Sequence, residues 1–316
     1  LGIERHLCAL PLAVLLENIA GVMAPLAHGA ACIVPPLGEV GLTGSSGFDP
    51  GMFHQAVLRH QPGSLILLPQ MLRAWTLWLN HHGERAPDCL RIVAVGGAAV
   101  GVGTLQAAHA AGIPACEGYG LSEGASVQTL NLPGAQCPGS AGRPLPHARL
   151  RVSAQGEIEV AGALFAGYLG SDVPVPEWWP TGDLGHIDAQ GFVHVHGRSR
   201  HVLITAFGRN VSPEWVESAL RDSACIAHAV VLGEAQPALS AVLWPAMPGV
   251  TDAQLDQAVQ AANATLPDYA RVHRWVRGQA AFDAASGMAT ANGRPQRAAV
   301  LALHLAALGI TETQIA

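Results

Sequence analysis

The chain has 316 residues, of which 50% are hydrophobic and only 13% are charged. This is the composition of a globular protein and not of a disordered one, and the length allows two domains with sizeable cores. The formal net charge is −6, all 17 basic residues are arginine, and no basic stripe or arginine cluster occurs, so neither nucleic acid nor an anionic membrane surface is expected as a partner.

The six cysteines are scattered and form no C-x-x-C pair, which predicts free thiols and a cytoplasmic, reducing environment. The first 36 residues are apolar, but Glu17, Asn18, His28 and several prolines interrupt them. No uncharged apolar run reaches the ~20 residues of a membrane span, and no signal peptide is recognisable, so no integral membrane association is expected. The chain reads as the rear part of a longer protein, and the oligomeric state is not predicted.

Helices and strands alternate in the first part of the chain. We expect a helix and then a short buried strand within 7–35, a capped helix and a strand within 48–69, a helix over 69–83, a strand over 90–95, a helix over 103–112 and a strand from 113 that runs into a loop near 118. Such alternation predicts a parallel sheet with helical crossovers, whose ligands gather at the carboxyl ends of the strands.

The pattern changes after Pro138. Apolar and polar residues alternate on both sides of turns at Gln155-Gly156 and Gln190-Gly191, which predicts antiparallel hairpins. Beyond residue 200 we expect a strand, a glycine loop, a helix with Ser212 as N-cap, two strands over 226–245 and an amphipathic helix over 251–266.

The histidines of "HVHGRSRH" suggest a metal site at first sight. His194 and His196 lie two apart on a predicted strand and share one face, but no third ligand follows at a useful spacing. We therefore interpret them as an ordinary strand face.

Four stretches carry a more specific signal: "EGYGLSEG" (117–124), "PTGDLGHIDAQGF" (180–192), "GRSRHVLITAFGRNVSPEWVE" (197–217) and "TANGRPQR" (290–297). Their order and spacing resemble the AMP-forming adenylating superfamily, and most closely its long-chain acyl-CoA synthetases. The resemblance implies a large N-terminal domain, 1–199, with a partial parallel α/β sheet (1–137) and a small antiparallel, barrel-like β-rich part (138–199). A small mobile α+β domain, 200–316, follows.

The chemistry of "EGYGLSE" suits a bound nucleotide. Tyr119 can stack on a purine, and Gly118 and Gly120 let the main chain approach it closely. Ser122 can donate to a phosphate oxygen, and the Glu123 carboxylate is a hard ligand suited to Mg²⁺ beside phosphates. The alternative interpretation is a surface turn with a solvated glutamate.

Two further segments complete the expected AMP site. The resemblance places Glu117, together with Gly97 and Ala98 of "GGAA" (96–99), along the adenine, although those glycines fit a tight strand-to-helix turn equally well. The resemblance also implies that the Asp183 carboxylate accepts hydrogen bonds from the two ribose hydroxyls. The alternative is that this aspartate only forms an Asx-type turn. Arg198 is the expected ribose or phosphate ligand, because its planar fork of donors suits such oxygens.

The resemblance also implies that the C-terminal domain changes its orientation between the two half-reactions. Its C-terminal domain reorients about the second residue after that arginine, here Arg200. In the second orientation, the loop "AFGRN" lines the channel of the thiol, so Gly208 would face coenzyme A or a carrier-protein pantetheine.

Arg294 stands where relatives carry a lysine that holds the acyl carboxylate and the α-phosphate. Arginine keeps the positive charge and can bind phosphate through two donors, but it is bulkier and its donors are fixed in a plane. Gln296 cannot supply the charge, and the sequence has no lysine. Two readings stay open: Arg294 replaces the catalytic lysine, or it is merely exposed and adenylation is weak.

Two other positions depart from the family. A serine/threonine- and glycine-rich phosphate loop ending in lysine is absent, and "LTGSSGFDPG" (42–51) is not that loop because it contains no basic residue. In "LPLAVLLEN", Val14 stands where an aromatic or histidine side chain is expected.

Two functions follow. The first is an AMP-forming carboxylate–thiol ligase that uses ATP, Mg²⁺ and a fatty or aromatic acid, inactive as these 316 residues alone. The alternative is a non-catalytic module that binds AMP or an acyl adenylate.

Overall fold

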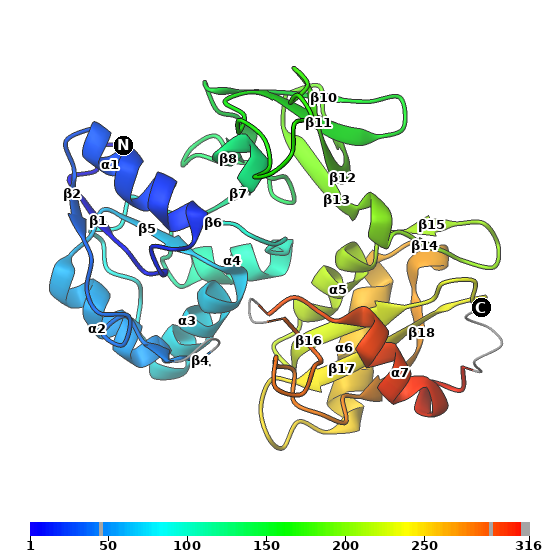
Figure 1. Cartoon of the computed structure of the whole chain (residues 1–316). Helices are drawn as coiled ribbons and strands as arrows, with labels where there is room; N and C mark the ends of the chain where they lie inside the picture. Colours follow the sequence, from blue (N-terminus) through cyan, green and yellow to red (C-terminus); the bar gives the residue numbers. More distant parts are fainter. Residues whose placement is uncertain (44–46, 291–292, 311–316) are drawn as a thin grey trace. The chain divides into compact units, whose positions relative to one another are not determined.

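The computed structural model describes residues 1–43, 47–290 and 293–310 of the chain. The chain divides into two compact units, Leu1–Val195 (unit 1) and His196–Ala316 (unit 2), and each is described by itself. Figure 1 shows their elements in chain order. Among the described residues, no helix is long and apolar enough to cross a membrane.

Unit 1 is built on a seven-stranded sheet in the order β2-β1-β5-β6-β7-β8-β9. The first five strands in this order are parallel, whereas β8 is antiparallel to β7 and to β9. This confirms the partial parallel sheet predicted from the alternation of helices and strands. The strands are β1 (Arg5–Leu7), β2 (Ala31–Ile33), β5 (Ser64–Leu67), β6 (Ile92–Val95), β7 (Ala115–Leu121), β8 (Ser126–Leu130) and β9 (Arg143–Pro144).

The crossovers of this sheet are the helices that the sequence predicts: α2 (Pro50–His60), α3 (Pro69–His82) and α4 (Val102–Ala110). The Asp49 carboxylate caps α2 by accepting from the N–H groups of Gly51 and Met52. All four residues of β5 are buried, as expected for a central parallel strand covered on both faces. The rings of Phe53 and Trp75 meet edge to face in the core between helices and sheet.

The N-terminal segment agrees with its prediction in part. The predicted helix and the strand after it are present, as a π-helical segment (Glu17–Met23) that continues into α1 (Ala24–Ala27) and as β2, but β2 is not buried and the earlier strand β1 was not predicted. The extended stretch before the helix is fixed by the buried Glu17 carboxylate, which accepts from the N–H groups of Ala9 and Leu10. A three-residue strand is too short to show a period in the sequence.

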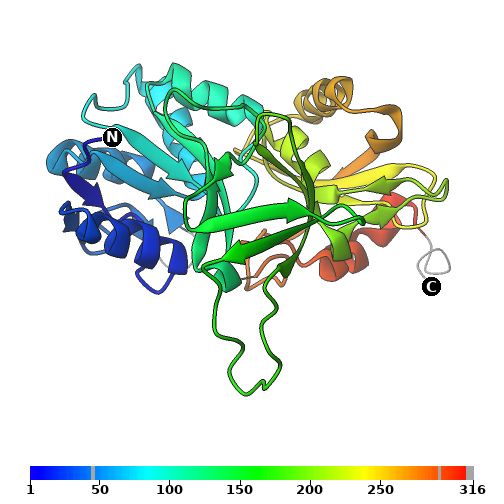
Figure 2. The same ribbon diagram turned by 90° about the horizontal axis from the view of Figure 1, so that it is seen from above.

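A second, four-stranded sheet in the order β10-β11-β12-β13 forms the antiparallel part of unit 1. Its turns hold Gly156 and Gly191 at φ of +79° and +84°, which explains the glycines at the two predicted hairpins. The long connection 163–178 extends away from this sheet (Figure 2). The strands are β10 (Ala148–Val152), β11 (Glu157–Gly162), β12 (Trp179–Ile187) and β13 (Val193–Arg198), and the last three residues of β13 belong to unit 2.

Two small hairpins, each formed by a pair of two-residue strands, complete the list of strands. In unit 1, β3 (Leu42–Thr43) pairs with β4 (Gly47–Phe48), and residues 44–46 between them lie outside the described residues. The acidic residue of "LTGSSGFDPG" is Asp49, the cap of α2. In unit 2, β14 (Leu203–Ile204) pairs with β15 (Asn210–Val211).

Unit 2 contains a three-stranded sheet that is buried on both faces. The strands β16 (Ile226–Leu232), β17 (Leu239–Pro245) and β18 (Val272–Arg277) follow in this order, with β18 parallel to β17. Alternate side chains of β16 and β17 enter two separate cores. Burial on both faces is why "AVVL" and "AVLW" read as continuous apolar runs.

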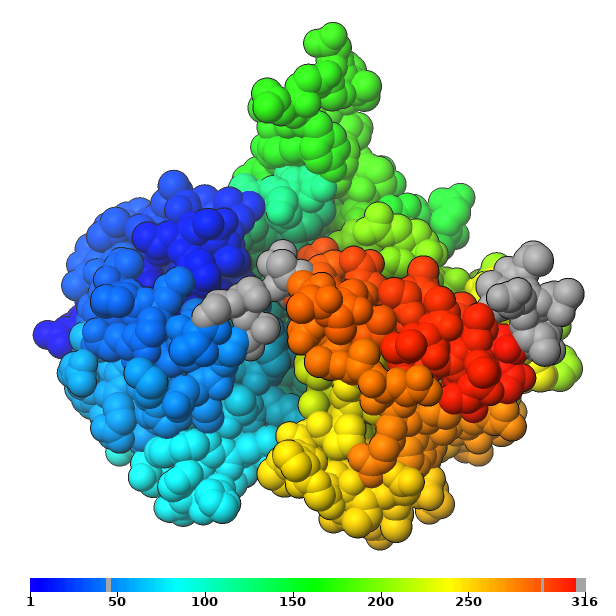
Figure 3. Space-filling view, turned by 60° about the horizontal axis from the view of Figure 1, so that its bottom comes forward, coloured from blue at the N-terminus to red at the C-terminus, as the bar shows by residue number. Residues whose placement is uncertain are grey.

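Helices cover both faces of this sheet. The helices α5 (Pro213–Arg221) and α6 (Asp252–Thr265) share one core with it, and α7 (Arg297–Leu308) shares the other. The outer face of α7, red in Figure 3, lies at the surface of the unit, where Leu303 is 42% exposed. Neither β18 nor α7 was predicted: three of the six residues of β18 are charged or histidine, and α7 begins two residues after Pro295.

Arg297 anchors the start of α7. Its guanidinium donates to both carboxylate oxygens of Glu217 in α5 and to the carbonyl oxygen of Val231 in β16, and it lies 3.4 Å from Glu214. Burial alone lowers the pKa of Arg297, but the adjacent Glu217 and Glu214 carboxylates raise it above its ordinary value. The second arginine of "TANGRPQR" is therefore a structural residue.

We expect Arg297→Met to lower the free energy of unfolding of unit 2 by about 3 kcal/mol, because Glu217 then remains buried without its cation. The matched control is Arg294→Met, three residues away and exposed, which should change it by less than about 0.5 kcal/mol. Urea denaturation of the chain, followed by hydrogen exchange of unit 2 amides, measures both. Equal effects of the two substitutions would contradict the anchoring role.

Candidate functional site

β7 brings the predicted "EGYG" residues from the first sheet of unit 1 to the second. The Tyr119 hydroxyl donates to Asp183 Oδ2 at 2.6 Å, across 64 positions of sequence. The Tyr119 ring packs against the core of the second sheet, formed by Ile158, Val160 and Val193. Two of the predicted nucleotide ligands are therefore in direct contact within one unit.

Asp183 is held in place by its own strand. It lies in the middle of β12 and is only 5% exposed. Its N–H donates to the Thr181 hydroxyl, which in turn donates to the carbonyl oxygen of Ile158 in β11. Because the carboxylate reaches Tyr119 from within a strand, the alternative of a local Asx-type turn does not describe this residue.

Glu117 fixes the "GGAA" loop. Its Oε1 accepts from the N–H of Val100, the residue directly after the loop. Gly97 lies against Leu68, whose Cδ2 would be 3.2 Å from a Cβ at this position, and Ala98 is exposed. The loop leaves the carboxyl end of β6 and Glu117 lies on the neighbouring β7, so both belong to the edge where parallel sheets bind ligands.

The packing of β8 against β7 explains why residues 118 and 120 are glycines. A Cβ at Gly118 would lie 2.8 Å from the carbonyl oxygen of Thr129, and one at Gly120 would overlap that of Ser126. Both glycines are needed because β8 approaches β7 this closely. Their approach to a purine stays a prediction.

Glu123 has a partner that the sequence reading missed. It lies in a short 3-10 turn (Ser122–Gly124), and its Oε1 accepts from the Tyr168 hydroxyl at 2.6 Å. This hydrogen bond is the main cause that raises the pKa of Tyr168 above its ordinary value. Tyr168 lies 45 positions away in the 163–178 connection, where it packs with Phe165 and Trp179, and no local pattern links it to Glu123. Ser122, next to Glu123, is exposed.

The other predicted residues lie in unit 2. Arg198 ends β13, Arg200 lies in a short 3-10 helix (Ser199–His201), and Gly208 lies in the loop between β14 and β15. Arg294 is exposed in a turn in which its N–H donates to the Thr290 hydroxyl and its carbonyl oxygen accepts from the Thr290 N–H. Residues 291 and 292 of this motif lie outside the described residues. Whether these four approach the unit 1 residues stays a prediction.

Val14 lies in the turn before the π-helical segment, where its N–H donates to the carbonyl oxygen of Pro11. The side chain is 38% exposed and presents only methyl groups. It supplies no aromatic or polar group at this position, as the sequence indicates.

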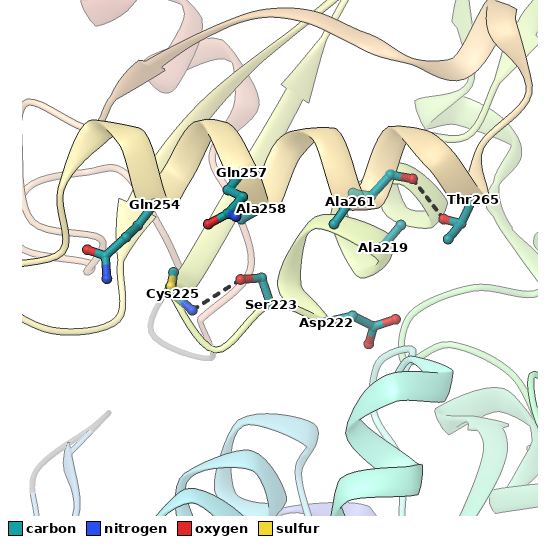
Figure 4. A pocket seen from close by; sticks show the side chains of 10 residues that line it. Ala219, Asp222, Ser223, Cys225, Gln254, Gln257, Ala258, Ala261 and Thr265 are labelled. Carbon is teal, nitrogen blue, oxygen red and sulfur yellow. Dashed lines mark hydrogen bonds between the residues drawn. The ribbon is translucent and has the colours of Figure 1, made fainter.

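A separate groove lies in unit 2 between α6 and the turn after α5 (Figure 4). Its walls combine small apolar residues with amide, hydroxyl and carboxyl groups, and none of the predicted nucleotide residues lines it. Its lining is Ala219, Asp222, Ser223, Cys225, Gln254, Gln257, Ala258, Ala261, Ala262 and Thr265.

Comparisons with known proteins agree with this architecture. A family model described as AMP-binding enzyme matches residues 3–169, and one described as AMP-binding enzyme C-terminal domain matches residues 200–307. The chain is 35% identical over 159 residues to the long-chain-fatty-acid–CoA ligase FadD15 of Mycobacterium tuberculosis, over 48% of this chain and 26% of that protein. It is 31% identical over 204 residues to the 2-succinylbenzoate–CoA ligase of Bacillus cereus, over 59% of this chain and 42% of that protein.

Solved structures show the same fold. The anthranilate CoA ligase AuaEII in complex with anthranoyl-AMP superposes with a TM-score of 0.80 at 21% identity, over 96% of this chain and 60% of that one. The O-succinylbenzoate coenzyme A synthetase MenE of Bacillus subtilis in complex with AMP gives 0.74 at 22% identity, over 93% and 60%. The chain thus spans less than half of these two curated relatives and about three fifths of these solved chains.

We expect Tyr119→Phe to lower the free energy of unfolding of unit 1 by about 1–2 kcal/mol, because the buried Asp183 carboxylate loses a donor. Tyr168→Phe is the matched control: it removes the same hydroxyl from a carboxylate, but Tyr168 is 56% exposed, so a loss below about 0.5 kcal/mol is expected. Chemical denaturation measures both. A Tyr119→Phe chain as stable as the unsubstituted one would show that this contact does not hold the two sheets together.

Proposed function

Because the chain belongs to the AMP-binding enzyme family, we propose that it binds a purine nucleotide and takes part in activating a fatty or aromatic carboxylic acid for transfer to a thiol. The observation that carries the proposal is the Tyr119–Asp183 contact, which joins two predicted nucleotide ligands from strands far apart in sequence. Glu117 lies on the same strand as Tyr119, and its Oε1 accepts from the N–H of Val100, next to the loop that leaves the carboxyl end of β6.

Unit 1 supplies groups for each part of AMP. Tyr119 offers a ring for the purine and Gly97 and Ala98 an open backbone beside it. Asp183 accepts from the ribose hydroxyls, because a carboxylate oxygen can accept more than one hydrogen bond. Ser122 donates to a phosphate oxygen. Arg198 is proposed to complete the ribose or phosphate contacts from unit 2.

The donor set around Glu123 fits Mg²⁺. This ion prefers oxygen ligands and is usually held by one or two carboxylates together with substrate phosphates and water. Glu123 is half-buried, and the neutral Tyr168 hydroxyl takes only one lone pair of its Oε1, so the carboxylate keeps acceptor capacity for a metal ion. When bound, the ion would offset the charge of the phosphates. Glu123 would hold it.

The proposed chemistry has two steps. A carboxylate oxygen of the acid bonds to the α-phosphorus of ATP, and the bond to the β-phosphate oxygen breaks, so pyrophosphate leaves with its electron pair. The thiol sulfur then bonds to the acyl carbon, AMP leaves, and the thiol proton goes to solvent. The chain's contribution is positioning and charge neutralisation, with Arg294 as the proposed cation at the carboxylate and α-phosphate.

The substrate class is supported by the relatives, whose names specify long-chain fatty acids and 2-succinylbenzoate. The thiol is proposed to be coenzyme A or a carrier-protein pantetheine, passing Gly208. For the proposed hinge at Arg200, the supporting observations are the C-terminal family model, which starts at residue 200, and the compact units, which divide at 195 and 196.

The alternative is a module that binds AMP or an acyl adenylate without catalysis. It is favoured by arginine in place of the lysine at Arg294 and by the exposure of this side chain. The 316 residues also contain no lysine, and therefore no serine/threonine- and glycine-rich loop that ends in lysine. We therefore propose that this chain by itself binds nucleotide with negligible turnover.

We expect Asp183→Asn to weaken AMP binding at least tenfold in isothermal titration calorimetry, because the amide keeps one acceptor for Tyr119 but loses the charge that strengthens the ribose contacts. Asp172→Ala in the 163–178 connection is the control and should bind AMP like the unsubstituted chain. Unchanged affinity of Asp183→Asn would remove the residue from the nucleotide site.

ATP–pyrophosphate exchange on the full-length gene product separates the two functions. For the ligase we expect vigorous exchange that falls at least a hundredfold in Arg294→Ala, in keeping with the loss of a group that stabilises transition-state charge. Glu234→Ala, also on the surface of unit 2, is the control. AMP binding without exchange would support the non-catalytic module.

A further inference from the structure

A cluster of metal-binding side chains lies in unit 1 apart from the nucleotide residues. One ligand atom each from Cys137, Asp188 and His194 lies within 4.8 Å of the other two. They come from the connection between β8 and β9, from the turn after β12, and from β13 (Figure 1). We propose that these three residues bind a Zn²⁺ ion. The proposed nucleotide chemistry does not need this ion, so the site is independent of that function.

The geometry suits this ion. With bonds of about 2.0–2.3 Å, a tetrahedral zinc ion holds its ligand atoms roughly 3.3–3.7 Å apart. His194 Nε2 and Asp188 Oδ2 already lie 3.2 Å apart. The Cys137 sulfur lies within 4.8 Å of both atoms, so it has to move by about 1 Å at most to reach the zinc-ligand separation. Sulfur, imidazole nitrogen and carboxylate oxygen together favour zinc over magnesium or calcium, which prefer oxygen alone.

The histidine is oriented as a metal ligand. Its Nδ1 lies 3.3 Å from the carbonyl oxygen of Gly139, which only accepts, so a neutral ring that donates from Nδ1 leaves Nε2 unprotonated and able to bind a metal ion. This directs Nε2 toward Asp188 and Cys137. A backbone carbonyl on the second ring nitrogen is the usual arrangement around zinc-binding histidines, because it fixes the tautomer and the ring. The ring also stacks on His186 at 4.5 Å, which limits its rotation.

Backbone hydrogen bonds also hold the other two proposed ligands, Asp188 and Cys137, in place. Asp188 Oδ1 accepts from the N–H groups of Gln190 and Phe192, which leaves Oδ2 pointing toward His194. The N–H of Cys137 donates to Oδ1 of Asn131, a residue that is 4% exposed and also donates to the carbonyl oxygen of Ser140. Supporting hydrogen bonds of this kind preorganise a metal site.

An Asp188–His194 ion pair alone does not explain the cluster. An ion pair does not explain why the Cys137 thiol lies beside these two residues. The side chains of Asp188 and His194 are 26% and 22% exposed, so an ion can reach them from solvent. Three protein ligands leave a fourth position for water. The bound ion would tie the 131–142 segment to the end of the strand that carries Asp183.

A second cluster in unit 1 is a poorer candidate. His6, Cys8 and Glu17 also lie within reach of one another, but Glu17 accepts from two backbone N–H groups and from His6, whose other nitrogen pairs with Ser64. Burial, and then the charge of Glu17, raises the pKa of Cys8 to about 12, which disfavours a thiolate ligand. A metal ion would have to displace this complete network.

Cobalt is the probe for the test, because a thiolate bound to Co²⁺ gives a charge-transfer absorption that surface histidines do not. The chelator-treated 316-residue chain should bind one Co²⁺ with this absorption, and Zn²⁺ should displace it. We expect Cys137→Ser to abolish the band and Cys89→Ser and Cys8→Ser to retain it. Absence of the band from the unsubstituted chain, or its survival in Cys137→Ser, would overturn the proposal.

Two further measurements guard against misfolding of a variant. Asp188→Asn keeps the Oδ1 acceptor of the turn and should weaken Co²⁺ binding at least tenfold, whereas the same affinity as the unsubstituted chain would contradict the site. Zn²⁺ should raise the melting temperature of the unsubstituted chain. In Cys137→Ser we expect the same melting temperature in chelator and no rise with Zn²⁺; an equal rise in both chains would place the ion elsewhere.

Discussion

The arrangement of unit 1 depends on one strand that serves two sheets. β7 pairs in parallel with β6 at its start and antiparallel with β8 further on, and its Tyr119 and Leu121 pack into the core of the second sheet. The Tyr119 hydroxyl then meets Asp183 on β12. Because Glu117 and Tyr119 lie on one continuous strand and the turn with Glu123 follows it directly, these three proposed ligands of unit 1 keep fixed positions relative to one another.

Local patterns in the sequence predicted much of this fold. The hairpins at Gly156 and Gly191, the helix capped by Asp49 and the alternating helices and strands were all readable, since each depends on neighbours within a few residues. The strand Arg5–Leu7 was too short to show a period, and Glu17, which fixes the segment after it, acts through contacts made only in the folded chain.

The candidate site was predictable in its residue types but not in its contacts. The "EGYG" and "TGD" stretches were recognised by their order and their resemblance to a family. The Tyr119–Asp183 bond spans 64 positions and the Tyr168–Glu123 bond 45, so neither leaves a local signature. For the glycines of "EGYG" the residues were noticed but the reason was different. The sequence suggests that they make room for a ligand, whereas in the structure they make room for the backbone of β8. Similarly, one arginine of "TANGRPQR" anchors α7 and the other is exposed.

The same argument explains why His194 reads as a plain strand residue in the sequence. Its nearest histidine in the motif, His196, contributes nothing to the cluster, while Cys137 lies 57 positions earlier in another sheet's connection. Two backbone hydrogen bonds draw these segments together: the N–H of Ala141 donates to Val193 at 2.8 Å, and the N–H of Val193 donates to Gly142 at 2.9 Å. Because these hydrogen bonds join the backbone directly, the fold itself brings the three ligands close. Zinc would then bind to a site that is already assembled, so its binding energy adds to the stability of the native state instead of creating it.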